Sequence, residues 1–143
     1  IVISGDVAAV ERASELAREA GARRVLPLNV SGAFHSPLMA VAEAGLAEQL
    51  DLVDLTAPEF PVVSNVNAEA VTEAARAREL LLRQLTSPVR WTACMRTILD
   101  GGVNTFLELG PGSVLSGLLR RIDRDAKAVT LGTVAEVEAF LGQ

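Results

Sequence analysis

Residues 105–131 read TFLELGPGSVLSGLLRRIDRDAKAVTL, and this stretch decides the fold class of the chain. Residues 105–109 alternate between two faces, as a half-buried strand does, and a Gly-Pro-Gly turn follows them. Apolar residues then recur at helical spacing from 114 to 122, and residues 128–131 predict a second strand. A strand, a helix and a second strand in this order favour a parallel pair of strands in an α/β fold.

The alternation of helices and strands continues on both sides of this stretch. Asp6 is a candidate N-cap for the first helix, which Gly21 ends, and Ser36 with Pro37 opens another helix by capping it. The remaining expected elements are strands at 1–4, 25–30 and 62–66 and helices at 72–85, 89–100 and 134–141. The whole chain therefore favours an α/β architecture with a largely parallel sheet.

Composition and charge exclude several classes of protein. The chain has 143 residues, enough for one core, and a formal net charge of −5, so no positive field would attract nucleic acid. No apolar run approaches the ~20 residues that span a bilayer, and the N-terminus lacks the pattern of a signal peptide. We therefore predict a cytoplasmic protein without nucleic-acid or membrane partners. Because the chain opens without Met on a strand-like stub, we expect it to be cut from something longer.

The sequence offers little for a metal or a cofactor. Cys94 stands alone, which excludes an intrachain disulfide and a cysteine-pair zinc site and makes it a small buried hydrophobe. The Gly-Pro-Gly turn at 110–112 lacks the lysine and the glycine spacing of a phosphate-binding loop. We predict neither a metal nor a cofactor.

His35 is the only histidine of the chain and the main candidate for chemistry. A single histidine beside a helix can be merely structural. Here it directly precedes Ser36-Pro37, where the positive end of the helix would disfavour an imidazolium and keep the ring neutral, as a general base requires. Loops that follow strands are also where α/β sheets place ligand chemistry.

Four blocks of the chain resemble a known family when they are taken together. In order they are VSGAFHSPLM at 30–39, PVVSNVN at 61–67, RQLTSPVRW at 83–91 and FLELGPGSVLSGL at 106–118. Each block alone is a weak signal, but four in the correct order and at natural spacing cover nearly the whole chain. The chain thus resembles the C-terminal half of the malonyl-CoA:acyl carrier protein transacylases, which belong to the acyltransferases of fatty acid and polyketide synthesis.

The resemblance implies a two-step acyl transfer with coenzyme A thioester and acyl carrier protein as partners. A serine takes malonyl from coenzyme A and passes it to the phosphopantetheine thiol of the carrier protein, with His35 as base and then as acid. No five residues of this sequence fit the family's Gly-x-Ser-x-Gly elbow, and the family's carboxylate-binding arginine lies upstream as well. The resemblance therefore implies a missing N-terminal half and an inactive piece when it stands alone.

The resemblance also implies further site residues. The backbone carbonyl of Gln84 is expected to orient His35, while the side chain of this glutamine is expected to be solvated. Phe34, beside the base, is expected to bind substrate and to favour malonyl. Arg24 is expected to meet coenzyme A phosphates or the acidic carrier protein, although a solvated surface charge would also explain it.

For the fold, the resemblance implies two subdomains. Residues 1–30 would be the closing β-α-β unit of a ferredoxin-like small subdomain, and residues 31–143 the C-terminal part of an α/β hydrolase-like large subdomain. Two alternatives stay open. One is an acyltransferase domain of a polyketide synthase, although the run at 117–122 looks more like the free-standing enzyme. The other is a non-catalytic interaction module with the same fold.

Overall fold

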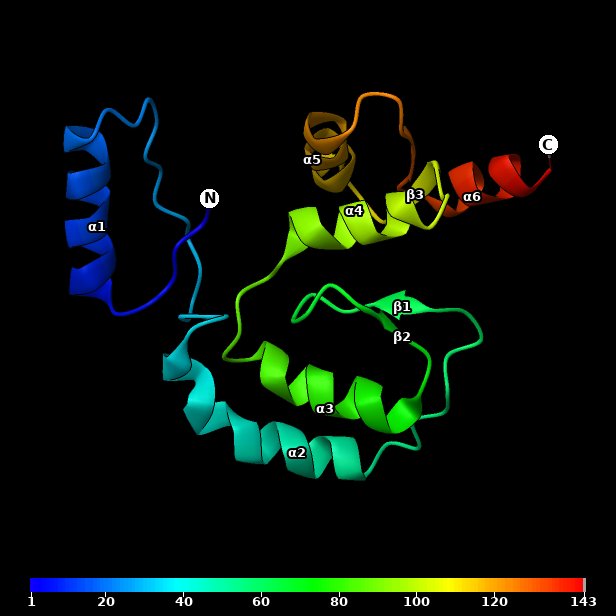
Figure 1. Ribbon diagram of the computed structural model, residues 1–143, viewed down its shortest axis with the longest axis horizontal. Helices are drawn as coiled ribbons and strands as arrows, with labels where there is room; N and C mark the ends of the chain where they lie inside the picture. Colours follow the sequence, from blue (N-terminus) through cyan, green and yellow to red (C-terminus); the bar gives the residue numbers. More distant parts are fainter. Residues whose placement is uncertain (143) are drawn as a thin grey trace. The chain divides into compact units, whose positions relative to one another are not determined.

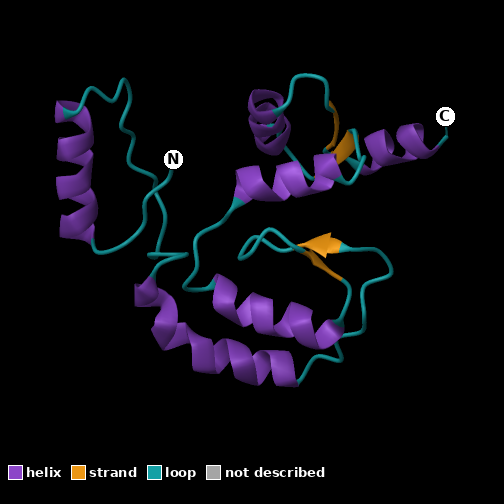
Figure 2. Ribbon diagram, in the orientation of Figure 1, coloured by secondary structure: helices purple, strands orange, loops and turns teal. Residues whose placement is uncertain are grey.

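The computed structural model describes residues 1–142, and its contacts divide it into two compact units, Ile1–Arg90 and the residues from Trp91 onward. Helices and short strands occur in the chain as a mixed α/β fold, which confirms the predicted class (Figure 2). The subdomain boundary at residue 30 stays a prediction. Among the described residues, no helix combines the length and the apolar character needed to cross a membrane.

The first helix, α1 (Val7–Glu19), forms where the sequence predicts it (Figure 1). The Asp6 carboxylate accepts a first-turn backbone N–H at 3.2 Å, and Gly21, at a φ of 89°, follows the helix end in the left-handed conformation. The strands predicted at 1–4 and 25–30 are wrong. Among residues 1–142, no strand pairs with either segment, so neither is part of a hydrogen-bonded ladder. Of the expected β-α-β unit, the described residues contain the helix and neither strand.

Two antiparallel helices form the framework of the rest of the first unit. The elements in chain order are η1 (Pro37–Ala42), α2 (Glu43–Asp51), β1 (Val62–Val63), β2 (Ala70–Val71) and α3 (Ala74–Gln84). The guanidinium of Arg78 on α3 pairs with Asp51 at the end of α2. The hydroxyl of Thr86, just after α3, donates to Glu43 at the start of α2 at 3.2 Å. The end of α3 is therefore held beside the start of α2.

The hairpin of β1 and β2 is antiparallel and packs on α3. It is shorter than the strand predicted at 62–66, because the chain already turns at Ser64, whose N–H donates to the Glu69 carbonyl at 3.0 Å. The sequence did not indicate β2, because a strand of two residues is too short to show an alternating pattern. The buried side chains that join the hairpin to α3 are Val66, Val71 and Leu80.

The second unit matches the sequence more closely. Its elements are α4 (Trp91–Asp100), β3 (Thr105–Leu109), α5 (Val114–Ile122), β4 (Lys127–Leu131) and α6 (Val134–Leu141). β3 and β4 pair in parallel along their five residues, and α5 connects them. The strand-helix-strand prediction is thus confirmed. The expected largely parallel sheet is present as this one pair in the described residues, because the other pair is antiparallel.

Glu108 on β3 stabilises the start of α5 by hydrogen bonds. Its carboxylate accepts the N–H groups of Leu115 and Ser116 at 3.0 and 2.8 Å and the hydroxyl of Ser116 at 2.5 Å. The hydroxyl's hydrogen bond is the main reason that the pKa of Glu108 lies below its usual value, and the backbone N–H groups add to it while desolvation opposes it. Glu108 therefore ties the start of α5 to the strand that precedes the glycine-rich turn.

Candidate active site

The loop before η1 attaches His35 to the C-terminal end of α3. The backbone N–H of His35 donates to the Leu85 carbonyl at 3.1 Å, and its ring Nδ1 lies 3.0 Å from the carbonyl oxygen of Gln84. His35 also has a φ of 62°, a left-handed conformation that costs a non-glycine residue about 1–2 kcal/mol. The contribution of Leu85 was missed by the sequence reasoning, because a main-chain acceptor leaves no mark in residue type.

The Gln84 carbonyl favours one tautomer of the His35 ring. A carbonyl oxygen only accepts, so its contact with Nδ1 favours the tautomer that carries the ring proton on Nδ1. The side-chain amide nitrogen of Gln84 lies 3.2 Å from the same Nδ1, a longer contact than that of the carbonyl, and it also donates to the Ser87 carbonyl at 3.1 Å. In that tautomer of the neutral ring, the other nitrogen, Nε2, has a free lone pair, which is what a general base requires.

The side chain of Gln84 does not have the surroundings that the sequence predicted. It was expected to be a solvated amide at a helix end, yet the amide is held by Ser87 and lies against the ring of His35. The loop after α3 brings the carbonyl of Ser87 to the side chain of Gln84 in the last turn of the helix. The sequence does not indicate this contact. Both the backbone and the side chain of Gln84 thus lie beside the histidine.

Ser36 also differs from its predicted role. Pro37 occupies the first position of η1 as expected, but the Ser36 side chain makes no capping hydrogen bond with the helix. Its hydroxyl donates instead to the carbonyl of Ala33 at 2.6 Å, and the residue is buried. The helix begins as a 3-10 turn, and the hydroxyl closes the preceding turn rather than the helix start.

Phe34 and Arg24, the other two predicted site residues, are both exposed. The ring of Phe34 lies over Gly32, where a Cβ would come within 3.3 Å of it, so this glycine leaves space for the ring. Phe34 is next to His35 in the same loop. Arg24 lies in the segment without regular secondary structure after α1, and no hydrogen bond or ion pair among residues 1–142 brings it to the His35 loop.

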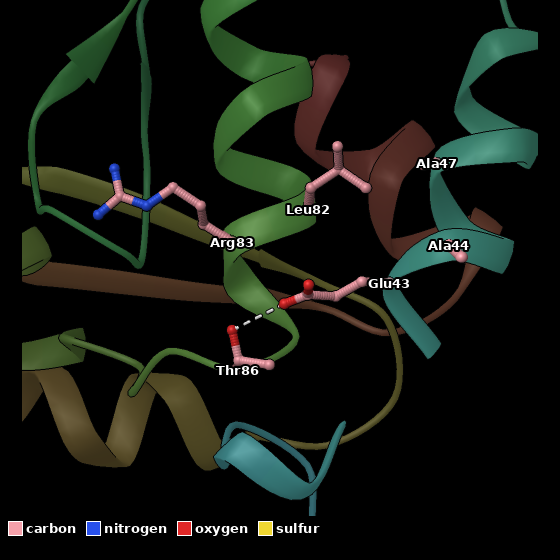
Figure 3. Close-up of a pocket in the computed structure, with 6 residues that line it drawn as sticks. All are labelled: Glu43, Ala44, Ala47, Leu82, Arg83 and Thr86. Carbon is pink, nitrogen blue, oxygen red and sulfur yellow. Dashed lines mark hydrogen bonds between the residues drawn. The ribbon is translucent and has the colours of Figure 1, made fainter. Parts of the chain in front are cut away.

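A pocket of about 360 Å³ lies between α2 and α3, but His35 does not line it. Figure 3 shows the residues that do, which are Glu43, Ala44, Ala47, Leu82, Arg83 and Thr86. The hydrogen bond between Glu43 and Thr86 crosses it. His35 is a better candidate for the active site than this open pocket, because its two ring nitrogens have different surroundings. Cys94 is buried in α4, as predicted.

Comparison with known proteins agrees with the resemblance in the sequence. The model of the acyl transferase domain family matches residues 1–137. The malonyl CoA-acyl carrier protein transacylase of Bacillus subtilis is 47% identical over 138 residues, which are 96% of this chain and 44% of that protein. The chain thus spans about half the length of the curated relatives it matches.

Solved structures give the same result. An acyl-carrier-protein S-malonyltransferase from Bartonella henselae superposes with a TM-score of 0.90 at 43% identity, covering 96% of this chain and 44% of that one. A malonyl-transacylase in complex with a type II polyketide synthase acyl carrier protein gives a TM-score of 0.88 at 41% identity, covering 97% and 45%. On the extent of these matches, the chain belongs to the acyl transferase family, and its relatives there are malonyl-CoA:acyl carrier protein transacylases.

Proposed function

We propose that this chain carries the histidine part of the active site of a malonyl-CoA:acyl carrier protein transacylase. The observation that supports it best is the ring of His35, whose Nδ1 lies 3.0 Å from a main-chain carbonyl, and we assign the uptake of a proton to its Nε2. The proposed reaction moves malonyl from the thiol of coenzyme A to the phosphopantetheine thiol of acyl carrier protein, and it supplies fatty acid synthesis.

The proposed mechanism uses one base twice. His35 Nε2 takes the proton of a serine hydroxyl while the serine oxygen attacks the thioester carbonyl; the C–S bond then breaks and the coenzyme A sulfur receives that proton. The carrier protein's thiol next gives its proton to His35 as its sulfur attacks the serine ester, and the serine oxygen recovers the proton. Neither proposed step requires a metal or a cofactor. Because the Gly-x-Ser-x-Gly elbow is absent from this sequence, we place the serine on an N-terminal part of the complete enzyme.

A neutral carbonyl suffices to orient the base. It fixes the tautomer and accepts the Nδ1–H of the imidazolium that forms during each step, as the carboxylate of a catalytic triad does with a full charge. The carbonyl of Gln84, 3.0 Å from Nδ1, is the group to which we assign this role.

The proposed partners are a coenzyme A thioester and acyl carrier protein. The structural neighbour in complex with a type II polyketide carrier protein supports the second of these, and it also favours polyketide synthesis as the alternative destination of the malonyl group. Arg24, exposed after α1, is proposed to meet coenzyme A phosphates or the acidic carrier protein. We propose a cytoplasmic enzyme with no nucleic-acid or membrane partner.

The proposed function is tested in a chimera that joins this chain to the N-terminal part of the Bacillus subtilis relative. We expect it to transfer malonyl to carrier protein and to prefer malonyl-CoA over methylmalonyl-CoA, because we propose that the ring of Phe34, the residue before the base, leaves less room for an α-methyl group. One methyl is worth about 1–3 kcal/mol, or roughly 10–200-fold in kcat/KM. The measurement is competition between the two thioesters. Absence of any transfer contradicts the function, whereas equal kcat/KM values contradict only the role of Phe34.

Replacing the Gln84 side chain in the chimera is expected to cost little. In Gln84→Ala the backbone carbonyl remains, and the loss is a neutral side-chain hydrogen bond worth about 1 kcal/mol, so kcat should fall by less than about 10-fold. Steady-state kinetics of Gln84→Ala and His35→Ala side by side measure the difference. Equal losses in the two variants would show that the amide, 3.2 Å from Nδ1, orients the ring instead of the carbonyl.

A further inference from the structure

We infer that Ser36 is a positioning residue that holds His35 in the backbone conformation used for acyl transfer. The inference rests on the proposed function, since it concerns how the proposed base is held. Ser36 is 4% exposed, and its hydroxyl donates to the carbonyl oxygen of Ala33 at 2.6 Å. A buried hydroxyl in so short a hydrogen bond is part of the fold of this loop and not a contact with solvent.

The hydrogen bond of Ser36 spans the strained residue. Ala33 and Ser36 are the two ends of a turn, and its central residues are Phe34 and His35. His35 has a φ of 62°, and a residue with a Cβ keeps this conformation only where its surroundings hold it. The Ser36 hydroxyl ties the two ends of the turn together, so it opposes relaxation of His35 toward a negative φ.

The other contacts of His35 hold it to a different part of the chain. The N–H bond to Leu85 and the ring contact with Gln84 both join His35 to the end of α3. They determine where the residue is attached, but not the direction in which the chain leaves it. Ser36 sets that direction, because its hydroxyl returns to Ala33 just before Pro37 begins η1. Without the hydroxyl, we expect the turn to open and the ring to leave the Gln84 carbonyl.

The test compares Ser36→Thr with Ser36→Val in the chimera. The two side chains have nearly the same shape, so a packing role would affect them equally, whereas only threonine retains a hydroxyl. A misplacement of about 1 Å can cost about 10²-fold in rate, and we expect kcat of Ser36→Val to fall by about 10–100-fold. The KM for malonyl-CoA should stay within about threefold, because Ser36 is buried and is not proposed to touch substrate. Ser36→Thr should retain kcat within about threefold.

Ser116→Ala is the matched control. Ser116 is 7% exposed, and its hydroxyl donates to Glu108 in the second unit, so the change removes a similarly buried hydroxyl elsewhere. It should lower the thermal midpoint and leave kcat unchanged. Equal kcat in the threonine and valine variants, whether retained or lost, overturns the inference, and so does a loss in Ser116→Ala as large as that in Ser36→Val.

His35→Ala, measured in parallel, separates this inference from the proposed function. If His35→Ala transfers malonyl normally, the proposed base is wrong. If His35→Ala is inactive while Ser36→Val keeps full kcat, the proposed function stands and only the role of Ser36 is wrong.

Discussion

His35→Ala in the chimera is expected to lower the kcat of malonyl transfer by at least about 10²-fold, the effect typical of a lost general acid-base group. The reason is that Nε2 is the atom proposed to take the serine proton, and alanine supplies no substitute. The measurement is the rate at which malonyl moves from malonyl-CoA to carrier protein. A binding defect would instead raise KM, so the loss should lie in kcat.

His35→Asn is the control for the backbone. Alanine is disfavoured at the φ of 62° found here, whereas asparagine is among the residues that tolerate it best. If both variants are equally inactive while the asparagine variant keeps the thermal stability of the parent, the missing group is the base. Near-normal transfer in either variant would contradict the assignment of His35.

The second unit could be predicted from sequence because its signals are local. The helix expected at 114–122 and the strand at 105–109 have the observed bounds of α5 and β3, since alternation, a glycine-rich turn and helical spacing follow one another without interruption. The strands expected at 1–4 and 25–30 failed for the opposite reason. A strand needs a partner as well as a pattern, and a local pattern does not reveal whether a partner lies beside it.

The residues of the candidate site and the contact of His35 with the Gln84 carbonyl could be predicted, whereas the conformation of the loop around them could not. His35 and the backbone of Gln84 were expected from the resemblance, and the structure brings them to 3.0 Å. The direction of the Ser36 hydroxyl was wrong, because a serine before a proline fits a helix cap as well as a closed turn. The positive φ of His35 leaves no signal in the sequence, because residue type alone does not show which hydrogen bonds will hold a residue with a Cβ in this conformation.

The purified 143-residue chain alone is expected to show no malonyl transfer. His35 would then have no serine to activate, because no Gly-x-Ser-x-Gly elbow is present, and the substrate carboxylate would have no upstream arginine. The chain is also expected to self-associate. β3 pairs with β4 in a two-stranded sheet, and Leu107 and Leu109 on β3 are 45% and 71% exposed. Apolar side chains beside an open strand edge favour pairing with another chain.

Adding the N-terminal part of the Bacillus subtilis relative as a separate polypeptide should correct both defects, since it would supply the serine and cover apolar surface. The measurements are malonyl transfer to carrier protein and molar mass by light scattering, for the chain with and without the added part. Transfer should appear only in the mixture, and the same mixture with His35→Ala should stay inactive because the serine then lacks its base. Robust transfer by the chain alone would overturn the mechanism, because a residue of this sequence would then have to be the nucleophile.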